Sequence, residues 1–296
     1  MARESFEARR GKWSSTGHAD RWWNSLELDV LPRLGRRSIA DLAHGDVLAV
    51  LNPIWTKKPD TARRVAQRIR AVFDWAKAKG HYVGENPVTP ALVAMGTQRL
   101  EVKHRAAMPW QEAPAFFTQL EPQEDIAAAA HRFLILTASR AGEVLGARWA
   151  KIEGDLWVIP PERMKMGRPH RAPLSAPALE ALDQVRGIGA DLVFPTPSRA
   201  KGPARPMTSN AFSARRGRTG VSGITTHGSR TTFRTWAADS ARAPREVAEL
   251  SLAHVTGSRV ERAYQRSDLL EQNRELLDAW AGYLRQAGGN VIKLHR

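Results

Sequence analysis

The polar stretch from Gly96 to Arg105 is the feature of this sequence that most limits its fold. Before it, apolar residues recur at helical spacing; from Ala106 onward, helical and strand-like patterns alternate. Because 296 residues are more than one ordinary compact domain needs, we expect two domains joined by this stretch. The predicted parts are a first domain over 1–95, a linker over 96–108, a second domain over 109–287 and a tail over 288–296.

The first domain is predicted to be helical. Its clearest helix runs from about Asp60 to Lys79, where apolar residues recur every three or four positions. These apolar residues are Val65, Ile69, Val72, Phe73 and Ala76. We also expect the aromatic residues Trp13, Trp22 and Trp23 to lie in the core of this domain.

Cations occupy the other faces of the same helix, at Arg63, Arg64, Arg68 and Arg70. Acidic residues one turn away, which would pair with them, are scarce. A solvated helix face and a surface that binds an anion are both compatible with this pattern. The linker leaves a similar choice, because Lys103 and Arg105 suit either a flexible tether or a segment that follows a phosphate backbone.

The second domain is predicted to be α+β and mostly helical. A buried helix over Ile126–Thr137 breaks at Ala138-Ser139, and a strand covers Leu156–Ile159. Met164–Leu174 is expected to form a hairpin with Gly167 and Pro169 at its centre. Further helices are predicted over Thr208–Arg216, His227–Ser240, Pro244–Leu252, Ser258–Arg266 and Leu269–Leu284. The predicted fold class is mostly α, with a small antiparallel sheet in the second domain.

The net charge of +15 narrows the choice of partner. Of the 45 cationic residues, 35 are Arg, whose planar fork matches phosphate oxygens. This favours a nucleic acid over a membrane surface, although a GC-rich genome would also raise the Arg content. The sequence has no apolar run long enough to span a bilayer and no export signal at its amino terminus. We therefore expect a soluble protein that stays inside the cell.

Cysteine is absent, which excludes disulfides, thiolate nucleophiles and Cys-based zinc sites. Covalent catalysis would have to use Ser, Thr, Tyr, Lys, His or a carboxylate. No group of Asp, Glu and His has the spacing of a metal site. The sequence therefore predicts neither a metal nor a cofactor.

Six candidate residues follow one another in the second domain: Arg140, Lys165, His227, Arg230, His254 and Tyr264. Each of them alone has an ordinary explanation. Arg140 could form a structural ion pair with Glu143, Lys165 could lie in a solvated turn, and Tyr264 could be a surface tyrosine. The two histidines could belong to a polar first turn and to the end of a helix.

Together the six residues suit phosphoryl transfer. Two Arg can hold the non-bridging oxygens of a phosphodiester and offset the charge of a pentacoordinate transition state. A Tyr hydroxyl is a poor nucleophile unless a base or nearby cations assist it. His227 and His254 could supply that base and a further hydrogen-bond donor, and Lys165 could protonate the departing sugar oxygen.

Four segments resemble the tyrosine recombinase, or phage integrase, family. Thr137–Trp149 resembles its first conserved box, Lys165–Ser175 its lysine hairpin, and Thr226–Arg234 its His-x-x-Arg box. Leu252–His254, followed by Ala263–Arg266, resembles the closing box. The match extends over roughly residues 106–284, and within the family it is closest to the integrases of genomic islands and satellite phages.

The resemblance implies a helical, SAM-like core-binding domain followed by an α+β catalytic domain. In its reaction a tyrosine attacks a scissile phosphate and forms a 3′-phosphotyrosyl link, without metal or ATP. The implied roles are nucleophile for Tyr264, phosphate binding for Arg140, Arg230 and His254, general acid for Lys165, proton transfer for His227 and orientation of Arg140 for Glu143.

The resemblance also implies partners. The substrate would be double-stranded DNA, bound by four protomers on two sites in the bacterial cytoplasm, at the nucleoid. Further DNA contacts are expected from Arg168, Arg171 and Arg234, besides the cations of the Asp60–Lys79 helix and of the linker. Host DNA-bending and directionality proteins are further candidate partners. Island integrases carry an amino-terminal arm-binding domain, which we expect this chain to lack, and its tail either docks on a neighbouring subunit or frays.

Two other functions would use similar residues. A type IB topoisomerase-like enzyme would nick and relax DNA without exchanging partners. A catalytically silent DNA-binding protein would keep the fold without the reaction. The two-domain layout and the resemblance to island integrases favour recombination over relaxation. The presence of all six catalytic candidates favours an active enzyme over a silent protein.

Overall fold

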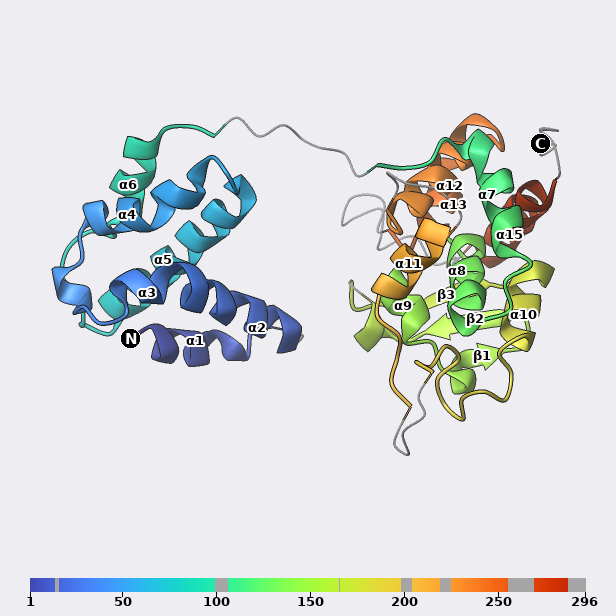
Figure 1. Ribbon diagram of the computed structural model, residues 1–296, viewed down its shortest axis with the longest axis horizontal. Helices are drawn as coiled ribbons and strands as arrows, with labels where there is room; N and C mark the ends of the chain where they lie inside the picture. The colour runs from blue at the N-terminus through green and yellow to red at the C-terminus, as the bar shows by residue number, and fades with distance from the viewer. Residues whose placement is uncertain are drawn as a thin grey trace. The chain divides into compact units, whose positions relative to one another are not determined.

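The computed structural model describes residues 1–13, 16–98, 106–164, 166–197, 204–218, 225–254 and 269–286. The chain divides into two compact units, Met1–Lys103 and His104–Arg296 (Figure 1). Each unit has a hydrophobic core of its own. Over the described ranges, none of the helices is both long enough and apolar enough to cross a membrane.

The first unit is helical throughout its described residues (Figure 1). Its α-helices are α1 (Ala2–Arg10), α2 (Thr16–Ser25), α3 (Leu31–Leu34), α4 (His44–Trp55), α5 (Pro59–Ala78) and α6 (Val88–Met95). A π-helical turn, η1 (Leu26–Val30), joins α2 to α3, and a 3₁₀ turn, η2 (Ile39–Asp41), precedes α4. The predicted helical fold of this part of the chain is confirmed.

The long helix α5 supplies much of this unit's core, as its hydrophobic spacing predicts. Val65, Ile69 and Phe73 are buried, with exposed fractions of 0%, 2% and 3%. After the helix, Gly80 has a φ of +74°, a left-handed conformation that residues with a side chain rarely adopt. The observed helix, Pro59–Ala78, differs from the predicted Asp60–Lys79 by one residue at each end.

Phe6 of α1 is surrounded by the three tryptophans predicted for this core. Its ring centroid lies 5.4 Å from those of Trp13 and Trp23 and 5.7 Å from that of Trp22. Aromatic rings at such separations attract one another beyond the area that they bury. The predicted position of these tryptophans is confirmed, since all three lie in or against the core.

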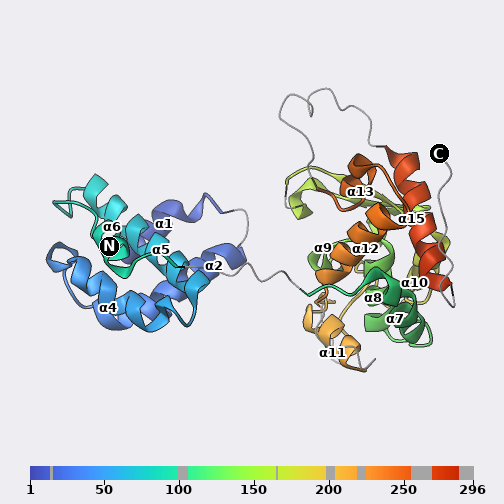
Figure 2. The same ribbon diagram turned by 90° about the horizontal axis from the view of Figure 1, so that it is seen from above.

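The second unit covers a small antiparallel sheet with helices (Figures 1 and 2). Its α-helices are α7 (Ala113–Leu120), α8 (Ile126–Leu136), α9 (Ala141–Leu145), α10 (Ala176–Asp183), α11 (Asn210–Arg218), α12 (Gly228–Asp239), α13 (Arg245–Ser251) and α15 (Leu270–Arg285). Its 3₁₀ turns are η3 (Trp110–Glu112), η4 (Trp149–Lys151) and η5 (Pro161–Arg163). Strands β1 (Ile152–Glu153), β2 (Leu156–Ile159) and β3 (His170–Pro173) are ordered β1-β2-β3. The predicted fold class, mostly α with a small antiparallel sheet, is confirmed.

Helix α15 packs against α12, whose first turn contains Arg230, and against α8, which ends before Arg140. Its Trp280 ring lies 4.9 Å from that of Trp236 on α12, and its indole N–H donates to the carbonyl of Ile135 on α8 at 3.0 Å. Both tryptophans are 1% exposed. This packing holds α12 and the end of α8 in one rigid core.

The predicted hairpin over Met164–Leu174 is wrong in its first strand. β3 pairs with β2, so that Ile159 lies opposite His170, and residues 160–169 form the connection. Pro160 and Pro161 explain the difference, because a proline has no N–H to donate to a strand ladder. The segment with Gly167 and Pro169 is therefore the turn of a longer hairpin that begins at β2.

Candidate active site

Arg140 lies at the break between α8 and α9. Ala138, with a φ of +48°, turns the chain out of α8, and Arg140 is the N-cap residue of α9. Glu143, 5% exposed, accepts hydrogen bonds from both the backbone N–H and Nη1 of Arg140, each at 2.8 Å. This carboxylate fixes the backbone and the side chain of Arg140 together.

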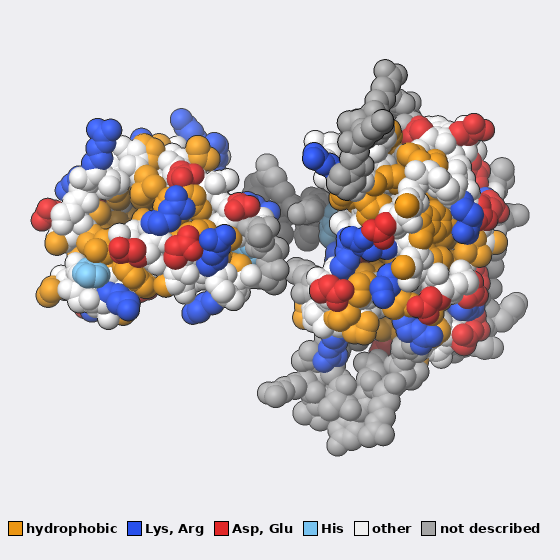
Figure 3. All heavy atoms as spheres, turned by 90° about the horizontal axis from the view of Figure 1, so that it is seen from below, with side chains coloured by type: hydrophobic (Ala, Val, Ile, Leu, Met, Phe, Trp, Pro, Cys, Tyr) orange, Lys and Arg blue, Asp and Glu red, His pale blue; other side chains and the backbone are white. Residues whose placement is uncertain are grey.

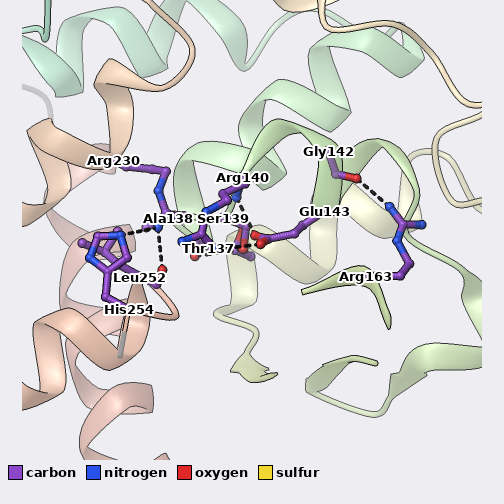
Figure 4. A network of polar contacts seen from close by, with 10 residues as sticks. All are labelled: Thr137, Ala138, Ser139, Arg140, Gly142, Glu143, Arg163, Arg230, Leu252 and His254. Carbon is purple, nitrogen blue, oxygen red and sulfur yellow. Dashed lines mark hydrogen bonds and ion pairs between the residues drawn. The ribbon is translucent and has the colours of Figure 1, made fainter. Parts of the chain in front are cut away.

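Arg230, in the first turn of α12, connects three separate segments and is 3% exposed. Its Nη1 donates to the carbonyl of Ala138, 92 positions away, at 2.6 Å. Its Nη2 donates to the carbonyl of Leu252 and lies 3.1 Å from Nε2 of His254. Figure 4 shows Arg230 and His254 on one side of Arg140 and Glu143. Four residues singled out from the sequence thus meet in one place.

The end of α13 determines where His254 lies. Ala253 has a φ of +48°, its N–H donates to the carbonyl of Leu250 at 2.7 Å, and the N–H of His254 donates to that of Glu249 at 2.9 Å. These two bonds around a left-handed residue form a Schellman motif. The motif places His254 directly after the helix, next to Leu252, whose carbonyl binds Arg230.

The positive charges at this site repel one another. Burial lowers the pKa of Arg230 to about 10, with a further lowering by Arg140 that Glu143 and Glu249 oppose. The guanidinium remains charged at neutral pH. Its Nε hydrogen has no acceptor among the residues that the structure describes. A bound anion beside these guanidinium groups would offset the repulsion, so the site is suited to a phosphodiester.

Arg163 holds the hairpin connection against α9. Its Nη2 donates to the carbonyl of Gly142 at 2.6 Å (Figure 4), and its Nη1 donates to that of Gly146. A Cβ at position 146 would overlap the Arg163 guanidinium. Arg163 lies in the connection between β2 and β3, two positions before Lys165 in the sequence. These bonds therefore fix the part of the connection that precedes Met164.

His170, the first residue of β3, is buried, with 8% exposed. Burial lowers the pKa of His170 to about 4; Glu143 opposes this shift, and Arg230 and Arg140 add to it. The imidazole is therefore neutral at physiological pH. It is a buried polar side chain beside the arginines rather than a member of a solvated turn.

We expect acid to destabilise the fold through His170. Below pH 6.5 an unfolded chain protonates this histidine and the folded chain does not until about pH 4. The free energy of unfolding should therefore fall by up to about 1.4 kcal/mol per pH unit across this window. This free energy is measured by hydrogen exchange of the backbone amides of β2 and β3, corrected for the intrinsic exchange rates. His170→Met should make the free energy of unfolding depend less on pH, whereas His44→Gln, at an exposed site, should leave that dependence unchanged. Equal pH dependence in the wild type and both variants would contradict the role given to His170.

The remaining catalytic candidates are placed differently. His227 is the exposed N-cap residue of α12, three positions before Arg230. Lys165 and Tyr264 lie outside the described residues, as do Lys103 and Arg105 of the predicted linker. The predicted helix over Ser258–Arg266 and the tail over 288–296 lie there too.

Known families match both halves of the chain. The sequence pattern of the phage integrase family matches residues 109–270, more than half of the chain. The phage integrase central domain matches residues 1–90. The chain belongs to the phage integrase family. This integrase is a site-specific recombinase of the tyrosine type.

Individual relatives agree with this assignment. Prophage integrase IntZ of Escherichia coli K12 is 36% identical over 287 residues, which cover 95% of this chain and 69% of the relative. The integrase of Enterobacteria phage P4 is 29% identical over 314 residues, 99% of this chain and 70% of the relative. The expected likeness to integrases of genomic islands and satellite phages is confirmed.

A solved structure shares the fold of this integrase. The lambda integrase tetramer bound to a Holliday junction superposes with a TM-score of 0.68 at 17% identity, covering 87% of this chain and 77% of the lambda chain. At this identity the likeness concerns the fold. It includes the helical and the α+β parts that the sequence predicts.

The cations of α5 predicted to contact DNA differ in their surroundings. Arg63 forms an ion pair on its own helix, and Arg68 donates to the hydroxyl of Ser25. Arg64 and Arg70 are exposed. Burial lowers the pKa of Arg68, with a further lowering by Arg64. Arg64 is therefore freer to reach a phosphate than Arg68, whereas Nη2 of Arg70 donates to the hydroxyl of Thr89 at 3.2 Å.

The cations predicted in the second unit also differ. Arg168 and Arg171 are exposed, whereas Nε of Arg234 donates to Oε1 of Glu249 at 2.8 Å. On the face in Figure 3, Lys and Arg side chains are interspersed with Asp and Glu on both units. On this face the net positive charge does not form a single stripe.

Sequence reasoning missed Glu249, which connects two predicted residues. Its carboxylate binds Nε of Arg234 at 2.8 Å through Oε1 and Nδ1 of His254 at 2.7 Å through Oε2. The available signal was an acidic residue five positions before a histidine at a helix end. In this chain a Schellman motif at the helix end accompanies the contact across that spacing.

Proposed function

We propose that this recombinase cleaves DNA through Tyr264, forming a 3′-phosphotyrosyl link and a free 5′-hydroxyl. The observation that supports this most is the meeting of Arg140, Arg230 and His254, which come from three separate segments. Their arrangement suits a phosphate whose charge increases in the transition state. Since the phosphotyrosine conserves the energy of the broken bond, religation needs no ATP.

Each remaining candidate has a role in this proposal. Lys165 protonates the departing 5′ oxygen, and His227 transfers the proton of the attacking hydroxyl. Glu143 orients Arg140, as its two 2.8 Å contacts allow. The positive charge that the phosphate requires comes from side chains.

The first unit and the linker bind the same DNA in this proposal. Residues 1–95 form a core-type DNA-binding domain, 96–108 a linker and 109–287 the catalytic domain. Arg63, Arg64, Arg68 and Arg70 contact phosphates from α5, and Lys103 and Arg105 do so from the linker. Arg168, Arg171 and Arg234 add contacts from the catalytic domain.

Recombination in this proposal needs four protomers on two duplexes, because two DNA molecules must each be cut on both strands. Lambda integrase, which shares the fold, is a tetramer on a Holliday junction. The tail over 288–296 docks on a neighbouring protomer, and host DNA-bending and directionality proteins assist. In this proposal the protein acts at the bacterial nucleoid.

The deciding experiment is a search for a covalent protein–DNA complex. The binding site is first selected from a pool of random-sequence duplexes, and a nicked duplex with this site then traps the cleaved strand. We expect a complex that survives denaturing electrophoresis, forms in the presence of EDTA and carries DNA on the Tyr264 peptide. A selected site that is bound but never cleaved would instead support a silent DNA-binding protein.

A further inference from the structure

We propose that Glu249 is a positioning residue that determines which ring nitrogen of His254 carries the proton. The role rests on the recombination chemistry proposed above. Glu249 lies on α13, and its side chain is 17% exposed. It contacts no part of the proposed reaction directly but holds His254, which contacts Arg230.

Glu249 binds His254 at two points. Its carbonyl accepts the backbone N–H of His254 at 2.9 Å, and its carboxylate Oε2 lies 2.7 Å from the ring Nδ1. The first bond belongs to the Schellman motif and does not involve the side chain of Glu249. A substitution at position 249 therefore changes the ring contact and leaves the backbone of His254 in place.

The two ring contacts of His254 determine its tautomer. Burial alone would raise the pKa of Glu249, but the hydrogen bonds from Arg234 and His254 lower it below its ordinary value, so this group is a carboxylate. A carboxylate only accepts, so Nδ1 must carry the hydrogen. The guanidinium of Arg230, 3.1 Å from Nε2, only donates, so Nε2 must accept. In the protein without DNA the ring therefore carries its hydrogen at Nδ1, and Nε2 accepts from Arg230 instead of donating to a phosphate.

This tautomer supplies Arg230 with a third acceptor besides the carbonyls of Ala138 and Leu252. With the proton on Nε2 instead, two N–H groups would face each other across 3.1 Å. The guanidinium would then keep only the two carbonyls. Donors stabilise a transition state best when they are held in place beforehand, so the loss should slow cleavage.

Arg234 makes the proposal testable with a single isosteric change. Its Nε donates to Oε1 at 2.8 Å, so both oxygens of Glu249 are occupied. A glutamine has only one oxygen, and the charged Arg234 competes for it more strongly than a neutral ring does. In Glu249→Gln the amide nitrogen therefore donates to Nδ1, and the ring proton moves to Nε2.

The experiment compares the wild type with Glu249→Gln and with Glu246→Gln, which removes the same charge from an exposed position on α13. Ring ¹⁵N chemical shifts, assigned to His254 with His254→Gln, report the tautomer without DNA. We expect Nδ1–H in the wild type and Glu246→Gln, and Nε2–H in Glu249→Gln. Formation of the covalent complex on the selected nicked duplex should slow at least about tenfold in Glu249→Gln only.

An unchanged tautomer in Glu249→Gln would overturn the proposal, and so would a changed tautomer with cleavage at the wild-type rate. Glu249→Asp keeps two acceptor oxygens and should retain Nδ1–H; Nε2–H in this variant would also contradict the role of the carboxylate. If the wild type forms no covalent complex, the recombination proposal fails by itself. The ¹⁵N spectra would still decide whether Glu249 sets the tautomer.

Discussion

Tyr264→Phe is expected to form no detectable covalent complex on the nicked duplex while it still binds that duplex. The substitution removes only the phenol oxygen, which is the proposed nucleophile, so no bond to phosphorus can form. Affinity should stay within about threefold of the wild type, because contacts from cations to phosphates dominate the binding of DNA. Denaturing electrophoresis measures the covalent complex, and a gel-mobility shift measures binding.

The chain supplies the matched controls for this variant, since it contains three tyrosines. The Tyr82 hydroxyl donates to the carbonyl of Glu85 and that of Tyr283 to the carbonyl of Trp110, each at 3.2 Å. Tyr82→Phe and Tyr283→Phe should both retain complex formation. A covalent complex that persists in Tyr264→Phe would identify another nucleophile and contradict the proposed mechanism.

Contacts between neighbours in the sequence could be predicted without a structure. Arg140 and Glu143 are three positions apart, and a break in an apolar helix indicates a cap. The buried face of α5 could also be predicted from the spacing of its hydrophobic residues, because helical periodicity is a local property. The resemblance to a family added the order of the six candidates, which no single segment contains.

Contacts between distant segments could not be predicted. The bonds of Arg230 to Ala138 and Leu252 span 92 and 22 positions, and the burial of His170 depends on its pairing with β2. The role of Glu249 needs the left-handed Ala253, a conformation for which alanine gives no signal. The bonds of Arg163 to the carbonyls of Gly146 and Gly142 also join positions that are far apart, by 17 and 21 residues.

The second large effect is expected from Arg230→Lys, which keeps the positive charge and changes its geometry. An ammonium cannot reproduce the planar fork that reaches the carbonyls of Ala138 and Leu252 and Nε2 of His254 together. We expect single-turnover cleavage to fall about 10²- to 10³-fold, the usual cost of losing one donor to a developing oxyanion. DNA affinity should change by less than about tenfold, since the charge remains.

The same substitution also tests how much Arg230 contributes to the stability of the fold. A lysine leaves at least one buried carbonyl without its donor, which should cost about 1–3 kcal/mol of the free energy of unfolding. Arg245→Lys, at the exposed start of α13, should change neither stability nor cleavage. Normalising the rate to folded protein separates the two effects. Cleavage by folded Arg230→Lys within tenfold of the wild type would mean that charge alone suffices at this position, and that the three contacts of Arg230 serve the fold rather than the phosphate.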